Sequence, residues 1–288
     1  MEISVITPVY NGERFIECCL NSVIEQACPY VEHLIMDGGS TDRTTEIVER
    51  YAAKHPHLRL ISENDAGQSD AMNKGIALAQ GVILGFLNVD DFYEPNVLNR
   101  VYEIFQELPE PSLLAGNCKV IDENGNLLWL NKPDTKYYQL LQVWRYKMPN
   151  NPSAYFYHRS LHDKIGGYDV EEHYTLDYDF LLRAFQKANV VYIDETLGNF
   201  RFYAGTKTSE SVAQGTQWDM ICRLSMKYAA QKGLFYRLYL HLSIAQLRAN
   251  LKEVENPSRI SKAKWILRRD GITLLDKVAR ALEKNGGR

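Results

Sequence analysis

The sequence predicts an α/β fold, with a mostly parallel, mixed sheet flanked by helices and an α-helical appendage at the carboxyl end. Short apolar, β-branched runs alternate with longer segments of helical period through roughly the first hundred residues, as in strands joined by helical crossovers. The 288 residues are 45% hydrophobic and 24% charged, an ordinary composition for a globular chain of this length. From residue 217 onward, helical patterning continues with few strand signals.

The first half of the chain alternates strands and helices. Strands are expected at residues 3–7, 34–36, 58–61 and 82–87. Helices are expected over residues 15–24, 66–79 and 97–105. Either Ser40 or Asp42 can cap the helix that follows the second strand, and Pro95 can open the last one.

Beyond residue 108 the pattern changes from crossovers to a hairpin. Strand-like segments 113–121 and 127–130 flank Asn124-Gly125, a strong hairpin signal. We therefore expect a single domain over residues 1–216, with halves 1–108 and 109–216, followed by a basic helical region over 217–288.

Cysteine usage and targeting signals favour a reduced, cytoplasmic setting. The five cysteines show no CxxC spacing, and no secretory signal or apolar run of about 18 residues is present. None of the seven histidines has metal-ligand spacing with another, and no nucleophile set of Ser/His/Asp or Cys/His type is recognisable.

The charge is divided unevenly along the chain. Residues 219–288 carry 15 Lys and Arg against 6 Asp and Glu, whereas the preceding residues carry 18 against 30. Segments 234–251, with Arg237 and Arg248, and 260–269 combine apolar and basic residues. They could rest on an anionic inner-membrane surface or form a solvated helical cap. Nucleic acid is not an expected partner.

Two consecutive carboxylates, Asp90 and Asp91, follow the apolar run 82–87. In an open α/β sheet, ligands bind beyond the carboxyl ends of the strands. Carboxylate oxygens there suit Mg²⁺ or Mn²⁺ carrying a substrate's phosphates. The alternative is a cap before the following helix. The pair favours a nucleotide-linked substrate.

The turn after the first strand is Thr7-Pro8-Val9-Tyr10-Asn11-Gly12, where a dinucleotide-binding protein carries G-x-G-x-x-G. This difference argues against a nicotinamide cofactor. Tyr10 offers a flat face on which a base could stack, and the Thr7 hydroxyl or nearby backbone amides could hold that base. Plain packing of Tyr10 is the alternative. Thr7, Pro8 and Tyr10 are therefore candidate nucleotide-binding residues.

Two further polar turns are expected at the same sheet edge. Asp37 could accept hydrogen bonds from a ribose hydroxyl or base N–H, or bond its own backbone. In the polar segment 62–75, Asp65 could contact the base, while Asn73 and Lys74 could support the nucleotide or pair with acids. For Asp70, a capping or solvated role is expected.

Together these turns resemble the family 2 glycosyltransferases of the GT-A fold, over roughly the first 205 residues. The resemblance is strongest to bacterial members that build exopolysaccharide, capsule or O-antigen, including the colanic-acid type. It implies an inverting, metal-dependent hexosyltransferase. The implied donor is a nucleotide-sugar, foremost a UDP-sugar with GDP and dTDP sugars open. The implied acceptor is a saccharide or polyprenyl-linked saccharide.

The family's D-x-D element corresponds to Asn88-Val89-Asp90. The resemblance implies Asp90 as the principal ligand of Mn²⁺ or Mg²⁺, with Asp91 adjoining it, and Asn88 and Val89 against the donor. Asn88 in place of an acid keeps an oxygen but removes a charge.

The segment Leu176-Asp177-Tyr178-Asp179-Phe180-Leu181-Leu182-Arg183 matches the family's E-D-x-D-L-x-x-R pattern, with Leu in place of Glu. Residues 177 and 179 lie about 200° apart on a helix, so they cannot both face one substrate. Asp179 is spaced to pair with Arg183, and Asp177 matches the family's catalytic base. Because the neighbouring Glu is missing, we expect a lowered rather than raised pKa for Asp177.

The loop 203–214 contains Lys207 and could close over a diphosphate, with Arg201 or Lys207 neutralising the leaving group. A solvated role for both is the alternative. Two other functions remain open. A nucleotidyltransferase normally carries a Gly-rich basic loop, which is absent here. A non-catalytic nucleotide-sugar-binding or scaffold protein would fit the departures at Asn88 and Leu176.

Overall fold

The computed structural model describes residues 2–141, 143, 147–149, 151–214 and 216–255. The chain divides into two compact units. The first comprises Met1–Thr135 and Pro149–Gln214, and the second Lys136–Met148 and Gly215–Arg288. The segment 136–148, expected in the second half of the large domain, thus belongs with the helical unit.

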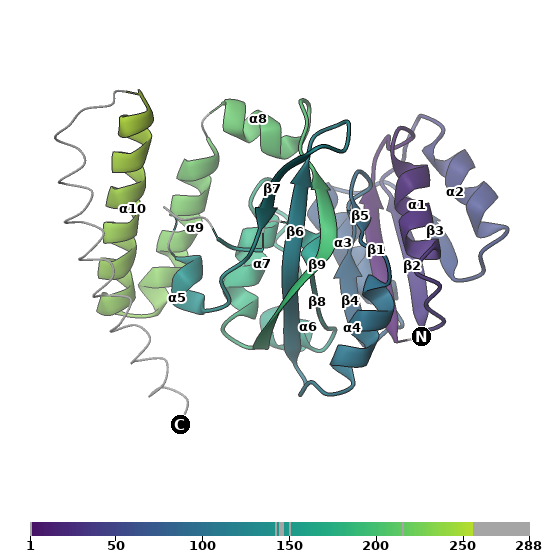
Figure 1. Ribbon diagram of the computed structural model, residues 1–288, viewed down its shortest axis with the longest axis horizontal. Helices are drawn as coiled ribbons and strands as arrows, with labels where there is room; N and C mark the ends of the chain where they lie inside the picture. The colour runs from purple at the N-terminus through teal and green to yellow at the C-terminus, as the bar shows by residue number, and fades with distance from the viewer. Residues whose placement is uncertain (1, 142, 144–146, 150, 215, 256–288) are drawn as a thin grey trace. The chain divides into compact units, whose positions relative to one another are not determined.

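The described strands of the first unit form one sheet (Figure 1). They are β1 (Ile3–Val9), β2 (Val31–Asp37), β3 (Leu58–Ser62), β4 (Ile83–Phe86), β5 (Phe92–Tyr93), β6 (Ser112–Ile121), β7 (Leu127–Asn131), β8 (Tyr155–His158) and β9 (Asn189–Arg201). Their order is β3-β2-β1-β4-β8-β6-β9-β5, and β7 pairs with β6. The first four strands are parallel, whereas β8 runs antiparallel to both its neighbours. The predicted mixed, mostly parallel sheet is therefore confirmed.

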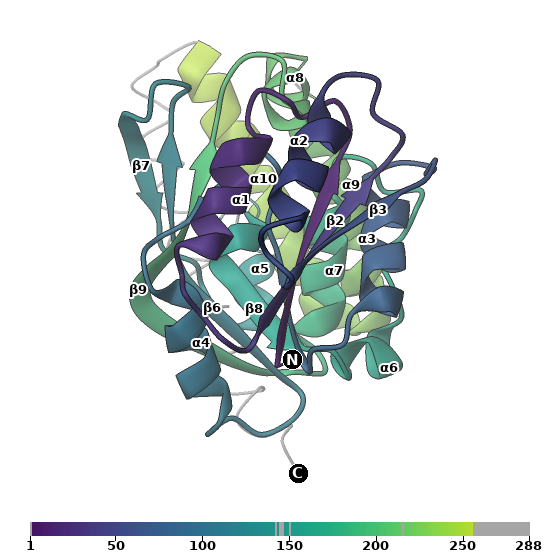
Figure 2. The same ribbon diagram turned by 90° about the vertical axis from the view of Figure 1, so that its right-hand side faces the viewer.

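Helices flank this sheet (Figure 2). They are α1 (Ile16–Ile24), α2 (Thr44–Ala52), α3 (Gln68–Leu78), α4 (Val97–Phe105), α6 (Leu161–Ile165) and α7 (Leu176–Ala184). The first unit also contains α8 (Lys207–Ala213), which lies beyond the strand ends in both views, and the short 3₁₀ turn η1 (Pro152–Ala154). Alternation along β1 directs Ile3, Val5 and Val9 toward the cores beneath α1. The side chain of Ile6 instead faces α3, where Gly75 lets the helix approach closely because a Cβ there would lie 2.5 Å from it.

The expected elements of the first half are all present, with shifted ends. β1 and β2 each continue past the expected ends, to Val9 and Asp37, because parallel pairing carries their backbones two residues and one residue further. The hairpin of β6 and β7 also forms as predicted. β8 and β9 were not predicted in detail, because their aromatic and mixed patterns lack a clear period.

The second unit contains α5 (Tyr137–Leu140), α9 (Gln217–Gln231) and α10 (Leu234–Glu255). Its α5 and α10 meet through aromatic rings, Tyr137 with Tyr236 at 5.8 Å between centroids and Tyr138 with Tyr239 at 6.3 Å. The segment 260–269, named above for its basic and apolar character, lies outside the described residues. No helix in the described part of the chain is long and apolar enough to span a bilayer.

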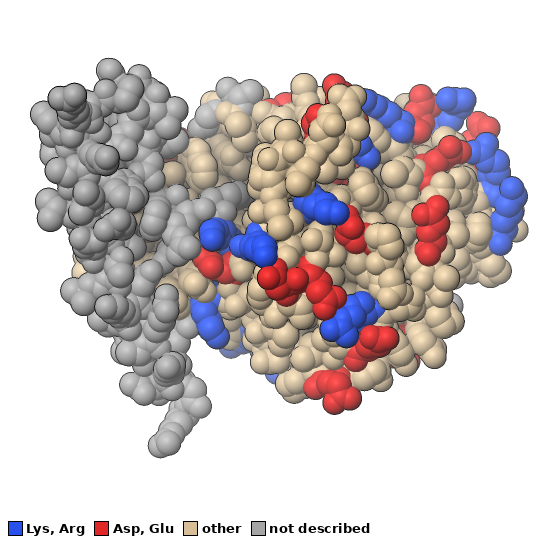
Figure 3. Space-filling view, in the orientation of Figure 1, with Lys and Arg blue, Asp and Glu red and all other residues tan. Residues whose placement is uncertain are grey.

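Acidic and basic side chains are interspersed on the face of the first unit shown in Figure 3. Ion pairs of this unit include Arg100 with Glu195 at 3.1 Å and Lys119 with Glu94 at 2.8 Å. The Arg100–Glu195 pair is solvent-accessible, and such pairs contribute little to stability.

Candidate active site

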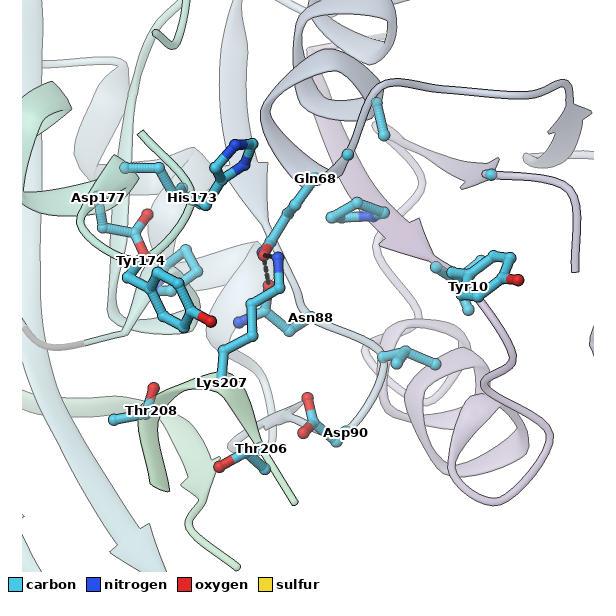
Figure 4. A pocket seen from close by; sticks show the side chains of 18 of the residues that line it. Tyr10, Gln68, Asn88, Asp90, His173, Tyr174, Asp177, Thr206, Lys207 and Thr208 are labelled. Carbon is cyan, nitrogen blue, oxygen red and sulfur yellow. Dashed lines mark hydrogen bonds between the residues drawn. The ribbon is translucent and has the colours of Figure 1, made fainter. Parts of the chain in front are cut away.

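The carboxyl ends of β1 and β4 open into a cavity of about 790 Å³ in the first unit. Residues from distant parts of the sequence line it, among them Pro8, Tyr10, Asp65, Gln68, Asn88, Val89, Asp90, His173, Tyr174, Asp177, Tyr203 and Lys207. Figure 4 shows Tyr10 at one side of this cavity and Asp177 at the other, with Asn88, Asp90 and Lys207 between them.

Tyr10 and Asp65 both line the cavity. Tyr10 follows β1 and is 64% exposed, so its ring is not core packing. Asp65 is fixed by the backbone N–H of Gly67, which donates to its Oδ1 at 2.8 Å. Gly38 allows the carboxylate to approach, because a Cβ there would lie 2.5 Å from Asp65 Oδ2. An aromatic face and a carboxylate are thus available together to one ligand.

A turn after β4 directs Asp90 into the cavity. The N–H of Asp91 donates to the carbonyl of Asn88 at 3.0 Å and closes this turn. The Tyr203 hydroxyl donates to Asp90 Oδ2 at 3.2 Å, and Gln68 Nε2 donates to Asn88 Oδ1 at 3.1 Å. Burial raises the pKa of Asp90, because the charged form loses solvation.

The structure does not bring Asp91, the expected adjoining metal ligand, into the cavity. Its carboxylate is buried and accepts hydrogen bonds from Asn151 Nδ2 at 2.8 Å, Asn88 Nδ2 at 3.0 Å and the Arg201 backbone N–H at 3.0 Å. Burial, and next the charge of Asp90, raise the pKa of Asp91 well above its usual range. Asp91 therefore ties the turn to β9 instead of presenting oxygens to a ligand.

Thr7 and Asp37 also lie outside the cavity lining. The Thr7 side chain is fully buried beneath α1, and its hydroxyl lies 2.9 Å from His33 Nε2. The Asp37 carboxylate accepts from the Gly39 N–H at 3.2 Å and the Ser62 hydroxyl at 2.6 Å. The turn-forming alternative for Asp37 is therefore the one observed.

Three other expected residues contact protein groups rather than line the cavity. Asn73 donates to the Tyr168 carbonyl at 2.9 Å and accepts from its N–H at 2.8 Å, which fixes the turn at 166–169. Lys74 pairs with Glu63 and Asp70, at 3.1 and 3.3 Å. The Arg201 guanidinium donates to the Asp90 carbonyl at 3.1 Å, so it supports the turn from behind.

Asp177 lies in the first turn of α7, half-buried, with its carboxylate in the cavity lining. The Tyr155 hydroxyl donates to Asp177 Oδ1 at 2.9 Å. Burial raises the pKa of Asp177 to about 6, against the opposing effect of that hydrogen bond. The lowered pKa expected from the missing Glu is thus wrong, because desolvation outweighs the loss of a like charge. The predicted pair of Asp179 with Arg183 is confirmed, at 2.8 Å from Nε.

Sequence reasoning missed several lining residues, and four of them carry polar side chains that matter below: Gln68, His173, Tyr174 and Tyr203. Gln68 lies between Asn88 and Lys207, and Lys207 Nζ is 3.4 Å from its Oε1 (Figure 4). Lys207 is the one lysine or arginine among the described residues that line the cavity, and burial lowers its pKa. None of the four belongs to a periodic pattern. Tyr174 could have been suspected only from its position three residues before Asp177.

The family model of "Glycosyl transferase family 2" matches residues 4–166, more than half of the chain. This chain belongs to glycosyl transferase family 2. A PGL/p-HBAD biosynthesis glycosyltransferase of Mycobacterium tuberculosis is 34% identical over 209 residues, which cover 70% of this chain and 77% of the relative. The expected glycosyltransferase identity is therefore confirmed.

Solved structures show the same fold. Staphylococcus aureus TarS 1-349 in complex with UDP-GlcNAc has a TM-score of 0.66 and 21% identity, covering 93% of this chain and 79% of TarS. The mannosyltransferase PcManGT from Pyrobaculum calidifontis, in complex with GDP-Man and Mn²⁺, has a TM-score of 0.60 and 18% identity, covering 99% and 87%. The GT-A fold predicted from the motifs is confirmed.

Proposed function

We propose that this glycosyltransferase moves a sugar, with inversion, from a nucleotide-diphosphate sugar to a hydroxyl of a saccharide or lipid-linked saccharide in cell-surface polysaccharide synthesis. The observation that carries the proposal is that Asp90 and Asp177 line one cavity together with Tyr10 and Asp65. The cavity volume of about 790 Å³ is in the range of small-molecule sites.

The nucleotide is assigned to the end of the cavity at Tyr10. Its exposed ring can stack on a base, and Asp65 can accept from a base N–H. Pro8 and Val89 contribute apolar side chains to the cavity lining. The family resemblance favours a UDP-sugar as donor, and the UDP-GlcNAc complex of TarS supports this choice. GDP-sugars are the competing donors, because PcManGT binds GDP-Man.

The residues present fit a divalent ion that is shared with a donor's phosphates. No group of three or more His, Cys, Asp or Glu in the described ranges could hold an ion by itself. Mg²⁺ and related ions commonly use one or two carboxylates together with substrate phosphates, and Asp90 is the carboxylate placed for this. When bound, Mn²⁺ or Mg²⁺ stabilises negative charge on the leaving diphosphate. Lys207, in the same lining, can neutralise part of that charge.

Asp177 is the group that accepts the proton of the acceptor hydroxyl. Its pKa of about 6 leaves it mostly ionised at neutral pH while keeping it a stronger base than an ordinary aspartate. As the hydroxyl oxygen bonds to the anomeric carbon, the bond to the diphosphate oxygen breaks on the opposite face. One displacement of this kind inverts the anomeric configuration.

A thermal-shift panel of UDP-, GDP- and dTDP-sugars, with and without Mn²⁺, tests the donor part on wild type and Asp90→Asn. One class of donor should raise the melting temperature of wild type, because a ligand that binds the folded state stabilises it. Mn²⁺ should enlarge that shift in wild type and not in Asp90→Asn. An equal response to Mn²⁺ in both proteins would contradict the role of Asp90.

Release of the nucleotide diphosphate separates an enzyme from a non-catalytic nucleotide-sugar-binding protein. Wild type should slowly release the nucleotide diphosphate from the nucleotide-sugar that raises its melting temperature, since water can replace the acceptor hydroxyl. A donor that binds but is neither hydrolysed nor transferred to any saccharide would favour the binding protein.

We further propose that the helical unit rests on the inner face of an anionic membrane. Leu234, Leu238 and Leu242 recur every four residues on α10 and are 81%, 51% and 38% exposed, with Arg237 beside them. Apolar and basic groups on one helix suit an anionic lipid surface. Flotation of the full chain with anionic vesicles at low salt should show binding. The replacement of the three leucines by serine should remove it, and absence of wild-type binding would refute the proposal.

A further inference from the structure

Tyr155 lies behind Asp177 and outside the cavity lining. It opens β8, between β4 and β6, and its side chain is fully buried. Its hydroxyl donates to Asp177 Oδ1 at 2.9 Å, across a separation of 22 residues. No motif of the family resemblance includes this tyrosine, and the strand it belongs to was not predicted.

Aromatic packing fixes the ring of Tyr155. Phe180 lies nearly parallel to it, at 6.2 Å between centroids with 16° between the planes. Tyr157 lies 6.5 Å away with 26° between the planes. Phe180 belongs to α7, the helix that carries Asp177. The Tyr155 hydroxyl is therefore held in one place relative to the first turn of that helix.

We propose that Tyr155 is a positioning residue for the proton-accepting carboxylate, holding Asp177 by Oδ1 so that Oδ2 faces the acceptor hydroxyl. This inference rests on the proposed role of Asp177 as the base. A neutral hydroxyl is suited to the task, because it can orient a carboxylate without neutralising it, as an arginine or lysine would.

The hydrogen bond also has a consequence for proton affinity. A donor to the ionised carboxylate stabilises the charged form, and so it opposes the rise in pKa that burial causes. The other titratable groups around Asp177 are Tyr157 and Tyr168 on the core side and His173, Tyr174 and Lys207 in the cavity lining. Of these, Tyr157 provides a matched control, because its hydroxyl lies 3.0 Å from His162 Nε2 rather than against Asp177.

The test compares Tyr155→Phe with Tyr157→Phe. Both changes remove one hydroxyl from a fully buried tyrosine of the same strand, so their effects on folding should be similar. The carboxyl carbon of Asp177 is titrated by ¹³C NMR in the full ligand-free chain, with its signal assigned by its loss in Asp177→Asn. The midpoint should rise by about one pH unit in Tyr155→Phe. The reason is that the lost hydrogen bond stabilised the ionised carboxylate by an amount equivalent to about one pKa unit. It should stay in place in Tyr157→Phe.

An unchanged midpoint in Tyr155→Phe, or equal shifts in both variants, would overturn the inference. The transfer rate is the second measurement, and its acid limb should move to higher pH in Tyr155→Phe alone. The NMR titration needs no substrate, so it separates two failures. If Asp177→Asn keeps full transfer activity, the proposed base is wrong even where the titration shifts. If Asp177→Asn is inactive and the titration does not shift, only the role of Tyr155 is wrong.

Discussion

Replacing Asp177 by Asn should stabilise the folded chain at neutral and alkaline pH. Burial raises the pKa of this carboxyl from 3.8 to about 6. A difference of about 2 pKa units corresponds to about 3 kcal/mol of unfavourable interaction with the ionised form. Because the side chain is only half-buried, solvent screening reduces the expected gain to about 2 kcal/mol. Asn is nearly isosteric, and its side-chain oxygen can still accept from Tyr155.

The pH window of this gain follows from proton linkage. The folded state binds the Asp177 proton more tightly than the unfolded state, so wild type loses stability as pH rises from 3.8 to about 6. Above that range both states are ionised, and the cost stays constant. The gain in the free energy of unfolding of Asp177→Asn over wild type should therefore be close to zero in strong acid. It should grow through this window and level off at neutral pH.

Urea unfolding of wild type and Asp177→Asn, at about pH 8 and about pH 5, measures the effect. The variant should gain about 2 kcal/mol at the higher pH and about half of that at the lower one. Asp163→Asn, which changes an exposed carboxylate on α6, serves as the control and should gain nothing. A gain that is absent, or equal at the two pH values, would refute the reasoning.

Three further outcomes are expected. Asp179→Ala should destabilise the fold by about 3–5 kcal/mol in urea unfolding, because Arg183 would be left as an unpaired, largely buried charge; a loss below about 1 kcal/mol would contradict this. Tyr10→Ala should weaken nucleotide binding about tenfold by calorimetry, in line with about 1–3 kcal/mol for a stacked base. The free energy of unfolding of Tyr10→Ala should match that of wild type, since Tyr10 is 64% exposed. An unaltered nucleotide affinity would contradict the stacking role of Tyr10. The transfer rate should fall as pH drops through about 6, where Asp177 gains its proton; a rate that stays flat through that value would exclude Asp177 as the titrating base.

The sequence was sufficient to place the cavity. In a parallel sheet, the residues after β1 and β4 come to the same edge. Pro8 and Tyr10 therefore line the same cavity as Asn88 and Asp90, as the strand-end positions predicted. Helical spacing likewise separated Asp179, which pairs with Arg183, from Asp177.

What could not be predicted depends on side-chain direction and burial. The turn of Asn88 to Asp91 sends two adjacent acids to opposite sides, and only the hydrogen bonds of Asp91 reveal which one is withdrawn. Thr7 is turned beneath α1, although it precedes the exposed Tyr10 by only three residues. The pKa of Asp177 depends on desolvation and on Tyr155, which is 22 residues away in the chain.

The most direct test of the account compares Asp177→Asn with wild type for both donor affinity and transfer, using the nucleotide-sugar that stabilises wild type most. Asp177 is assigned to proton acceptance rather than donor binding, so donor affinity should be retained while the transfer rate falls by roughly 10²–10⁴-fold. A variant that transfers sugar at the wild-type rate, or one that loses its donor affinity together with transfer, would contradict that assignment.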